Sequence, residues 1–85
     1  MDDRISAAIS QERQRQASLW SEPHRWGRGD CSSPEVDSIT KSAVLTEECG
    51  EVARAVLIDD AEALRTELTH VAAVAVAWLE GMTWD

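Results

Sequence analysis

The stretch SAVLTEECGEVARAVL (residues 42–57), followed after a short break by EALRTELTHVAAVAVAWLE (residues 62–80), decides the fold. Apolar residues in and just before the first stretch recur at steps of three and four, which is typical of an amphipathic helix. Asp59 with Glu62 three residues later has the order of a helix-capping pair, so the next helix can begin almost at once. We therefore expect two long helices that pack as a tight antiparallel hairpin.

The residues before this hairpin predict one further helix and one long loop. Asp2 or Asp3 can cap a helix over about residues 3–20. Residues 21–33, SEPHRWGRGDCSS, contain Pro, two Gly and several polar residues, a composition that favours turns over a continuous element. The apolar residues of the helix fall on roughly one face, with Gln and Arg on the other: Ile5, Ile9, Ala17 and Trp20.

The boundaries of the hairpin helices follow from capping signals. The tripeptide SPE at residues 33–35 has the order of an N-cap, a first-turn proline and an acid near the positive end of the helix dipole. The second helix is therefore expected over residues 34–58, beginning there or by Asp37. The third is expected over residues 60–80, with a stop at Gly81.

The length of the chain predicts a single domain, residues 1–85, that associates with further copies. Such a chain buries only about 60–65% of the surface that its unfolded form exposes. Val71 to Leu79 are apolar around nearly the full helix circumference, more than a three-helix chain can cover. Trp78 and Trp84 are expected to pack in the core or in an interface. The expected fold is all-α: an antiparallel helical hairpin plus an N-terminal helix, forming a helical bundle on oligomerisation, as a homodimer or homotetramer.

The charge of the chain argues against nucleic-acid binding. Sixteen Asp and Glu against eight Lys and Arg give a formal net charge of −8, whereas binding to nucleic acid relies on basic residues that neutralise phosphates. The same acidic surplus suits a protein that gathers carboxylates around divalent cations, because bound metal offsets their mutual repulsion.

The apolar segments and the cysteines predict a cytoplasmic protein without a membrane span. The longest apolar run, Val71 to Leu79, has nine residues, where a membrane span needs about 20. No apolar stretch resembles a signal peptide, so Cys31 and Cys49 are expected to be free thiols in a reducing cytoplasm. Cys49 is interpreted as a small buried hydrophobic residue.

The chemistry-bearing residues of the hairpin are Glu47, Glu48 and Glu51 in the run EECGE, and Glu67 and His70 in the run ELTH. Residues three apart lie one above the other on a helix face. Across an antiparallel hairpin centred on the predicted turn, Glu51 is level with Glu67, and Glu48 with His70. Burying such carboxylates unpaired is costly, so a cation is the expected compensation. A charged face in water is the alternative for EECGE alone, but it gives no reason for a matching ligand pair on the next helix.

These runs resemble the motifs of the MazG-like nucleotide pyrophosphohydrolases, part of an all-α nucleoside triphosphate (NTP) pyrophosphatase superfamily. That family carries E-E-x-x-E on one helix and E-x-x-D on the next, matched here by EECGE at residues 47–51 and ELTH at residues 67–70. The resemblance extends over residues 42–57 and 62–80, and more loosely to the QERQRQ segment and the loop that contains Trp and His. It implies hydrolysis of a nucleoside triphosphate between the α and β phosphates, which gives a monophosphate and pyrophosphate.

By the same resemblance, Glu48, Glu51, Glu67 and His70 bind Mg²⁺, and Glu47 orients or deprotonates the attacking water. His70 departs from the family pattern, which has Asp at this place. Mg²⁺ prefers hard oxygen ligands, whereas imidazole suits transition metals. The expected cofactor is therefore Mg²⁺ or Mn²⁺, with Mn²⁺ the better fit to the nitrogen ligand.

Five further residues are candidates for binding the nucleotide. Lys41 lies two helical turns before the first expected metal ligand, on nearly the same face, where its ammonium can reach a phosphate. A solvated lysine is the alternative. Arg25 or Arg28 can hold the triphosphate, and Trp20 or Trp26 can stack on the base.

Two other functions stay open at this point. Glu67 and His70 also match the ExxH signature of helix-bundle dimetal carboxylate proteins, whose full ligand inventory a homodimer would supply. Iron or manganese redox chemistry is therefore one alternative. The other is a non-catalytic helical dimer that binds a nucleotide or a partner, because His70 replaces the family's Asp.

Overall fold

The chain folds mainly into helices, as predicted. The computed structural model describes residues 1–82, so the packing expected for Trp84 lies outside the described residues. No helix in this described part is long and apolar enough to cross a membrane. The elements, in chain order, are α1 (Asp3–Leu19), β1 (Pro23–His24), β2 (Gly27–Arg28), α2 (Ser38–Leu57) and α3 (Ala61–Gly81).

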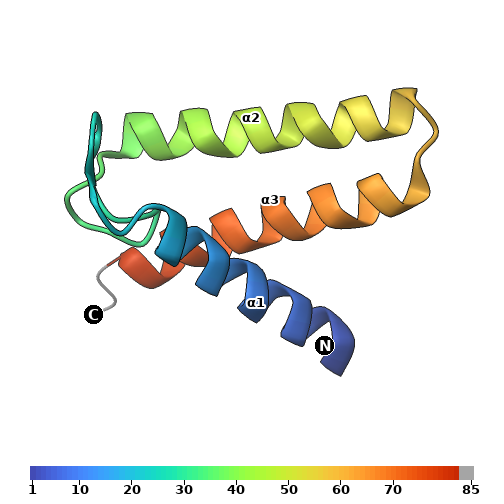
Figure 1. Ribbon diagram of the computed structural model, residues 1–85, viewed down its shortest axis with the longest axis horizontal. Helices are drawn as coiled ribbons and strands as arrows, with labels where there is room; N and C mark the ends of the chain where they lie inside the picture. Colours follow the sequence, from blue (N-terminus) through green and yellow to red (C-terminus); the bar gives the residue numbers. More distant parts are fainter. Residues whose placement is uncertain (83–85) are drawn as a thin grey trace.

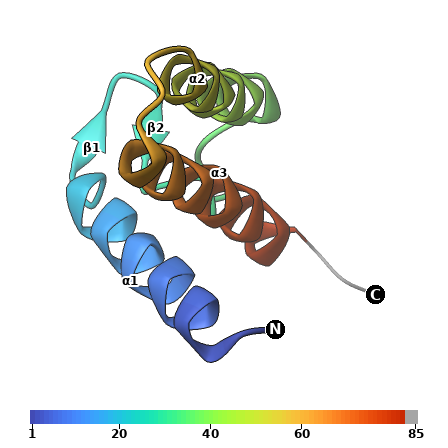
Figure 2. The same ribbon diagram turned by 90° about the vertical axis from the view of Figure 1, so that its right-hand side faces the viewer.

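The third helix lies between the other two (Figures 1 and 2). α2 and α3 lie side by side and run in opposite directions, which is the predicted hairpin. α1 packs against α3 and does not contact α2. The loop with the two strands lies at the end of the molecule opposite the α2–α3 turn (Figure 1). Helix α3 is therefore the element on which both other helices rest.

The turn between α2 and α3 shifts the cap of α3 by one residue. Asp59 adopts a left-handed conformation with φ 54°, and its N–H donates to the carbonyl of Val56 at 3.1 Å. The N–H of Asp60 donates to the carbonyl of Ala55 at 3.1 Å, which completes a Schellman motif. Asp60 then caps α3, since its side chain accepts from the N–H of Ala63 at 2.9 Å. The prediction that Asp59 is the cap is therefore wrong.

Helix α2 begins later than the range predicted, at Ser38 rather than at the proline before it. The hydroxyl of Ser33 accepts from the N–H of Glu35 at 3.1 Å, so this residue closes a turn of its own instead of capping a helix. Asp37 is the cap of α2, with its side chain accepting from the N–H of Thr40 at 2.8 Å. The later of the two predicted starting points is the one found.

The loop expected to contain only turns forms a small β-hairpin, so that expectation is wrong. β1 pairs antiparallel with β2, with Pro23 opposite Arg28 and His24 opposite Gly27. Gly27 has a φ of 129°, and a Cβ at this position would collide with the backbone carbonyl of Glu35. Only glycine combines this conformation with so close an approach. The hairpin can therefore lie against the segment that leads into α2.

The apolar core is small and lies where α2 and the loop meet α3. Cys31, Val74 and Ala77 are buried, and Val44 and Leu45 of α2 pack against them. No large side chain of the described chain is fully buried. The fold therefore depends on polar contacts as well as on this core.

Helix α1 is buried through polar side chains rather than through its predicted apolar face. Its buried residues are Glu12 and Gln16, whereas Ile5 is 53% and Trp20 40% exposed. Of the other two residues of the predicted face, Ile9 is half-buried and Ala17 is exposed. The apolar face is therefore wrong as the main contact surface of α1. Cys49, predicted to be buried, is exposed on α2.

The apolar surface that remains exposed is not the stretch from Val71 to Leu79 that the sequence indicates. Most of this stretch is at least partly covered within the chain, because α1 and α2 pack on α3. Exposed large apolar side chains are spread over the described chain, and Leu79 is one of them. Three of them are consecutive, from the last turn of α2 into the turn after it: Val56 (58% exposed), Leu57 (85%) and Ile58 (57%).

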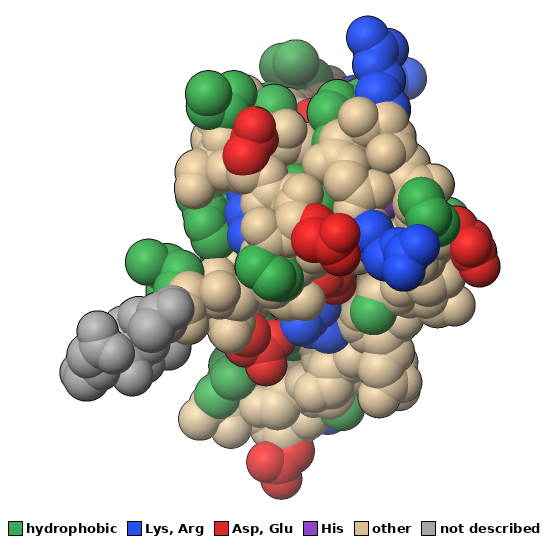
Figure 3. Space-filling model, turned by 90° about the vertical axis from the view of Figure 1, so that its left-hand side faces the viewer, with side chains coloured by type: hydrophobic (Ala, Val, Ile, Leu, Met, Phe, Trp, Pro, Cys, Tyr) green, Lys and Arg blue, Asp and Glu red, His purple; other side chains and the backbone are tan. Residues whose placement is uncertain are grey.

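A network of ion pairs ties α1, the loop and α3 together. Arg13 donates from Nη1 to Asp30 Oδ2 at 2.8 Å, and from Nε and Nη2 to Glu80 Oε1 at 2.9 and 2.6 Å. Asp30 also accepts from the N–H of Ser32 at 2.9 Å. Burial raises the pKa of Asp30, but hydrogen bonds from Ser32 and the charge of Arg13 outweigh it and lower the pKa overall. Figure 3 views the molecule from the loop end and shows acidic and basic side chains next to one another there.

We expect Asp30 to make the fold sensitive to acid. A carboxyl whose pKa is lower in the folded than in the unfolded chain stabilises the fold above its unfolded pKa, and this contribution is lost as the pH falls through the folded pKa. The free energy of unfolding, measured by urea titration, should therefore fall below about pH 4. Asp30→Asn should lower it by about 1–3 kcal/mol at neutral pH and weaken this acid dependence, whereas Glu22→Gln in the same loop should do neither. Equal acid sensitivity in wild type and Asp30→Asn would contradict this role.

Candidate metal centre

Two carboxylates and one imidazole meet where α2 and α3 pack together. Ligand atoms of Glu48, Glu67 and His70 all lie within 4.8 Å of one another. His70 Nδ1 is 3.5 Å from Glu48 Oε2 and 3.3 Å from Glu67 Oε2. The contact between Glu48 and His70 agrees with the predicted register of the hairpin. In the part of the chain that the structure describes, this is the one group of His, Cys, Asp or Glu that could hold a metal ion.

The chemistry of this group fits a divalent cation. Carboxylate oxygens suit Mg²⁺ and Mn²⁺, and an imidazole nitrogen adds a ligand that transition metals accept more readily than Mg²⁺. The three side chains come from facing helices, which is how metal sites are built inside helical bundles. The donor set therefore fits Mn²⁺ better than Mg²⁺.

The Glu48 carboxyl is partly buried and lies among like charges. Burial raises the pKa of its carboxyl. The charge of His70 acts in the opposite direction, but Glu67, Glu47 and Glu12 add to the increase, and the pKa lies above its ordinary value. A carboxyl destabilised in its charged form by neighbouring carboxylates is a group that a bound cation would relieve.

A third carboxylate, Glu12 of α1, faces the other side of the same imidazole. Its Oε1 lies 3.6 Å from His70 Nε2, and its side chain is 8% exposed. Arg15 donates from Nε to Oε1 and from Nη2 to Oε2, both at 2.7 Å, and Gln16 donates to Oε2 at 3.0 Å. The hydrogen bond from Arg15 lowers the pKa of Glu12 despite the opposing effect of burial, so Glu12 remains ionised at neutral pH.

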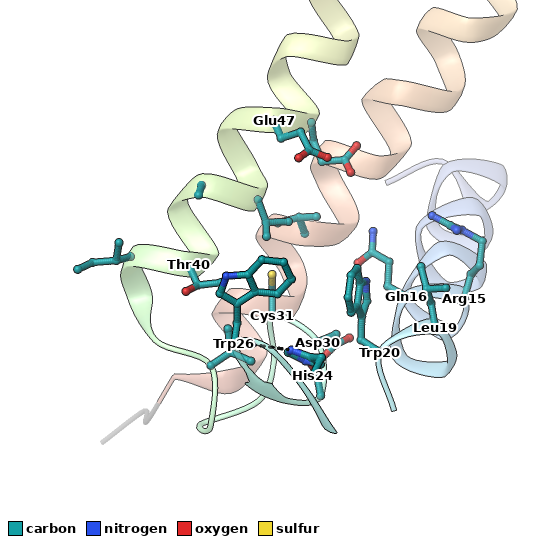
Figure 4. A pocket seen from close by; sticks show the side chains of 17 residues that line it. Arg15, Gln16, Leu19, Trp20, His24, Trp26, Asp30, Cys31, Thr40 and Glu47 are labelled. Carbon is teal, nitrogen blue, oxygen red and sulfur yellow. Dashed lines mark hydrogen bonds between the residues drawn. The ribbon is translucent and has the colours of Figure 1, made fainter. Parts of the chain in front are cut away.

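A cavity of about 630 Å³ adjoins this group (Figure 4). α1, the loop and α2 supply most of its lining, and Val74 of α3 also faces it. Trp20 and Trp26 stand on two sides of its lower end in Figure 4, with Glu47 at the other end. The two indole rings have centroids 6.5 Å apart and planes inclined by 72°. The cavity therefore has an aromatic end and an acidic end, and Glu48 lies on its wall.

His24 holds the aromatic end in place. Its Nδ1 accepts from the N–H of Trp26 at 3.2 Å, and its Nε2 lies 2.8 Å from the carbonyl of Gly29. With Nδ1 as the acceptor, Nε2 is the nitrogen that donates. Its ring centroid is 5.3 Å from that of Trp20, in an edge-on arrangement. His24 thus fixes the hairpin turn and packs beside both indoles.

The structure brings only some of the sequence-predicted site residues to this cavity. Glu47, Trp20 and Trp26 line it, as their expected roles require. The three cationic candidates for the triphosphate do not. Lys41 is buried, 6% exposed, so it is not the solvated lysine weighed as its alternative; Arg25 and Arg28 are exposed on the hairpin.

Glu51 is exposed and lies outside the group of metal-capable side chains. It stands three residues after Glu48, which is about 60° around the helix. Glu48 points toward α3, whereas Glu51 lies to the side of this contact surface. Only part of the predicted four-ligand set therefore converges in the structure.

Sequence reasoning missed His24 of the loop and three residues of α1. Glu12, Arg15 and Gln16 belong to the QERQRQ segment, whose Gln and Arg residues are predicted on the face opposite the apolar one. The signal that could have found them is spacing, because Glu12 and Gln16 are four residues apart and share a helix face. Their contact with the hairpin could not be predicted, since it depends on how α1 packs across α3.

Comparisons of the chain with models of protein families, with curated proteins and with solved structures gave no match.

The grouping of ligands predicts which replacements weaken metal binding in the absence of nucleotide. Glu48→Gln, Glu67→Gln and His70→Ala should each weaken Mn²⁺ binding by at least about tenfold, measured by calorimetry or electron paramagnetic resonance. Glu51→Gln is the matched control from the same helix, and it should change the affinity by less than about threefold, since an exposed charge is screened. A loss for Glu51→Gln as large as that for Glu48→Gln would mean that Glu51 is a ligand of the metal.

Proposed function

We propose that this chain is a metal-dependent nucleoside triphosphate pyrophosphohydrolase of the MazG-like family. The observation that carries the proposal is the double position of Glu48, which belongs to the carboxylate and imidazole group and also lines the cavity. A ligand in the cavity can therefore meet a metal ion and two aromatic rings at once. A nucleotide has the matching chemistry, with an anionic chain at one end and a flat base at the other.

Each end of the cavity would bind a different part of the nucleotide. Its volume, about 630 Å³, is within the range of about 300–1,000 Å³ that is usual for small-molecule sites. Trp20 and Trp26 offer apolar faces on which a base can stack. The triphosphate would then point toward Glu47 and Glu48, with Glu67 and His70 next to them.

The reaction would be attack of water on the α phosphorus. A divalent cation bound by Glu48, Glu67 and His70 would offset the negative charge of the phosphate oxygens. Glu47, exposed in the cavity wall, accepts a proton from the attacking water as general base. The new P–O bond forms to the water oxygen, the bond between the α phosphorus and the bridging oxygen breaks, and pyrophosphate leaves.

Nucleotide binding without turnover is the second candidate function, and one observation favours it. Among the described residues that line the cavity, Arg15 is the one Lys or Arg. Its Nε and Nη2 both donate to the carboxylate of Glu12. Few cationic groups remain to stabilise the charge that develops on a leaving pyrophosphate. Turnover therefore depends on the metal more strongly than in a site with free arginines.

A panel of nucleoside triphosphates tests the proposal. Purified protein should release pyrophosphate and the monophosphate from at least one of them, faster with Mn²⁺ than with Mg²⁺. Glu47→Gln should lower kcat by about 10²–10⁴-fold, the usual contribution of a general base. Glu62→Gln, an exposed acid in the first turn of α3, is the control and should leave kcat unchanged.

The outcomes separate the candidate functions. Saturable nucleotide binding without pyrophosphate release would favour the non-catalytic function. Colour that develops with iron and oxygen would favour a dimetal redox protein. Turnover that survives Glu47→Gln would remove this residue from the reaction.

We further infer that the working form is an association of two copies. The core is small, and Val56, Leu57 and Ile58 form a continuous exposed apolar run where α2 ends. A chain of this size gains much of its stability by burying such surface against another molecule. A second copy that packs its own run against this one would cover both at once, as expected for a symmetric interface.

Light scattering at micromolar concentration should give twice the mass of the chain. The double replacement of Leu57 and Ile58 by Glu should convert the dimer to a monomer, because four carboxylates would face one another across a symmetric contact. Ile5→Glu, at an equally apolar exposed position on α1, should leave the dimer intact. A monomeric wild type, or a dimer that survives the double replacement, would refute this interface.

A further inference from the structure

We propose that Glu12 is the positioning residue of the metal centre, which holds His70 so that Nδ1 faces the metal together with Glu48 and Glu67. This inference rests on the metal site of the proposed function. It adds a role for α1, which carries none of the ligands expected from the family resemblance.

The argument starts from the two nitrogens of His70, which meet different partners. Nδ1 lies 3.5 Å from Glu48 Oε2 and 3.3 Å from Glu67 Oε2. Nε2 lies 3.6 Å from Glu12 Oε1. A neutral imidazole has one nitrogen that donates and one that accepts. A metal ion held by Glu48 and Glu67 would take the lone pair of Nδ1, which leaves the ring proton on Nε2, the nitrogen that faces the Glu12 carboxylate.

Glu12 has the properties that such a positioning carboxylate needs. Its side chain is only 8% exposed, so water competes little for it. Arg15 binds both of its oxygens at 2.7 Å, and Gln16 donates to one of them at 3.0 Å. These three hydrogen bonds fix the plane of the carboxylate. Ligating histidines commonly donate their second N–H to a carboxylate, which sets the orientation and the tautomer of the ring.

A direct ligand role for Glu12 is the main competing explanation. The two nitrogens of an imidazole point away from each other, so a cation shared with Glu48 and Glu67 lies on the Nδ1 side of the ring. Glu12 is on the Nε2 side, and its oxygens already accept from Arg15 and Gln16. A carboxylate held in this way orients the imidazole and is not free to turn toward the metal.

The first test reads the protonation of His70 in the protein loaded with Zn²⁺, a diamagnetic ion that accepts imidazole. Long-range ¹H–¹⁵N nuclear magnetic resonance spectra should show Nδ1 coordinated and Nε2 carrying the proton. Coordination through Nε2 would overturn the proposal, because Glu12 would then compete with the metal. A spectrum of His70 that Zn²⁺ leaves unchanged would also overturn it.

The second test is a double-mutant cycle read out as Mn²⁺ affinity without nucleotide. Glu12→Gln should weaken binding by about 10–100-fold, the usual effect of losing a carboxylate that orients a ligating histidine. In a His70→Asp background, which has no imidazole to orient, the same replacement should cost less than about threefold. Glu12→Asp, which keeps the charge but shortens the side chain, should give an intermediate loss.

A matched control separates positioning from a general effect on the packing of α1. Glu80→Gln removes a carboxylate that pairs with Arg13 across the same contact between α1 and α3. It should lower thermal stability and leave Mn²⁺ affinity within about twofold. Equal losses of affinity from Glu12→Gln with and without His70, or a loss from Glu80→Gln as large as from Glu12→Gln, would refute the proposal.

These measurements do not depend on turnover. If the spectra and the cycle give the expected results but no triphosphate is hydrolysed, the proposed activity fails while the role of Glu12 stands. If pyrophosphate is released but Glu12→Gln has no effect on metal affinity, the role of Glu12 fails alone.

Discussion

The packing of α1 on α3 depends on carboxylates held by arginine. Adjacent residues of α1, Glu12 and Arg13, take part in separate networks that lead to different parts of the molecule. Arg13 reaches the loop at Asp30 and the last turns of α3 at Glu80. Such partly buried pairs are costly to break, because the group left behind remains away from water without a partner. Specific pairing therefore replaces much of the apolar contact that a helix of this length would normally make.

These polar contacts also bring three carboxylates together around His70. Glu12, Glu48 and Glu67 surround one imidazole, in a chain whose formal net charge is −8. Arg15 compensates Glu12, but it leaves the two carboxylates on the other side of the ring without a cationic side chain of their own. Burial is the first cause of the raised pKa of Glu48, and the charges of the neighbouring glutamates add to it. A divalent cation would offset the repulsion between Glu48 and Glu67 more effectively than a proton, since one ion can interact with both carboxylates.

The sequence predicts the hairpin well because local rules control it. Apolar spacing gives α2 and α3, the short break gives their antiparallel packing, and counting from the turn places Glu48 next to His70. The failures have identifiable physical causes. Asp59 adopts a left-handed conformation within the turn, so Asp60 is the N-cap of α3. Gly27 allows two short strands in a loop for which the sequence predicts turns.

The parts of the candidate site that escape prediction depend on tertiary packing. No local pattern states that Glu12 faces α3, since a run of Gln, Glu and Arg is equally suited to a solvated face. Lys41 has the predicted spacing from Glu48, but its side chain is buried and does not line the cavity. Glu51 likewise follows the motif in sequence while its position around α2 turns it to solvent. A motif fixes which residues share a helix, and the angle between helices decides which of them meet.

The two networks of α1 link the loop that lines the cavity to the metal-capable group. At one end, Arg13 fixes Asp30, which lies in the same loop as His24 and Trp26, and at the other end Glu12 faces His70. Because Glu12 and Arg13 are adjacent residues, the loop and the metal-capable group are both linked to the same turn of α1. A shift of α1 along α3 would disturb the orientation of the imidazole and the position of the loop together. Under the proposed function, α1 would therefore set the distance between the part of the cavity that takes the base and the part that takes the phosphates.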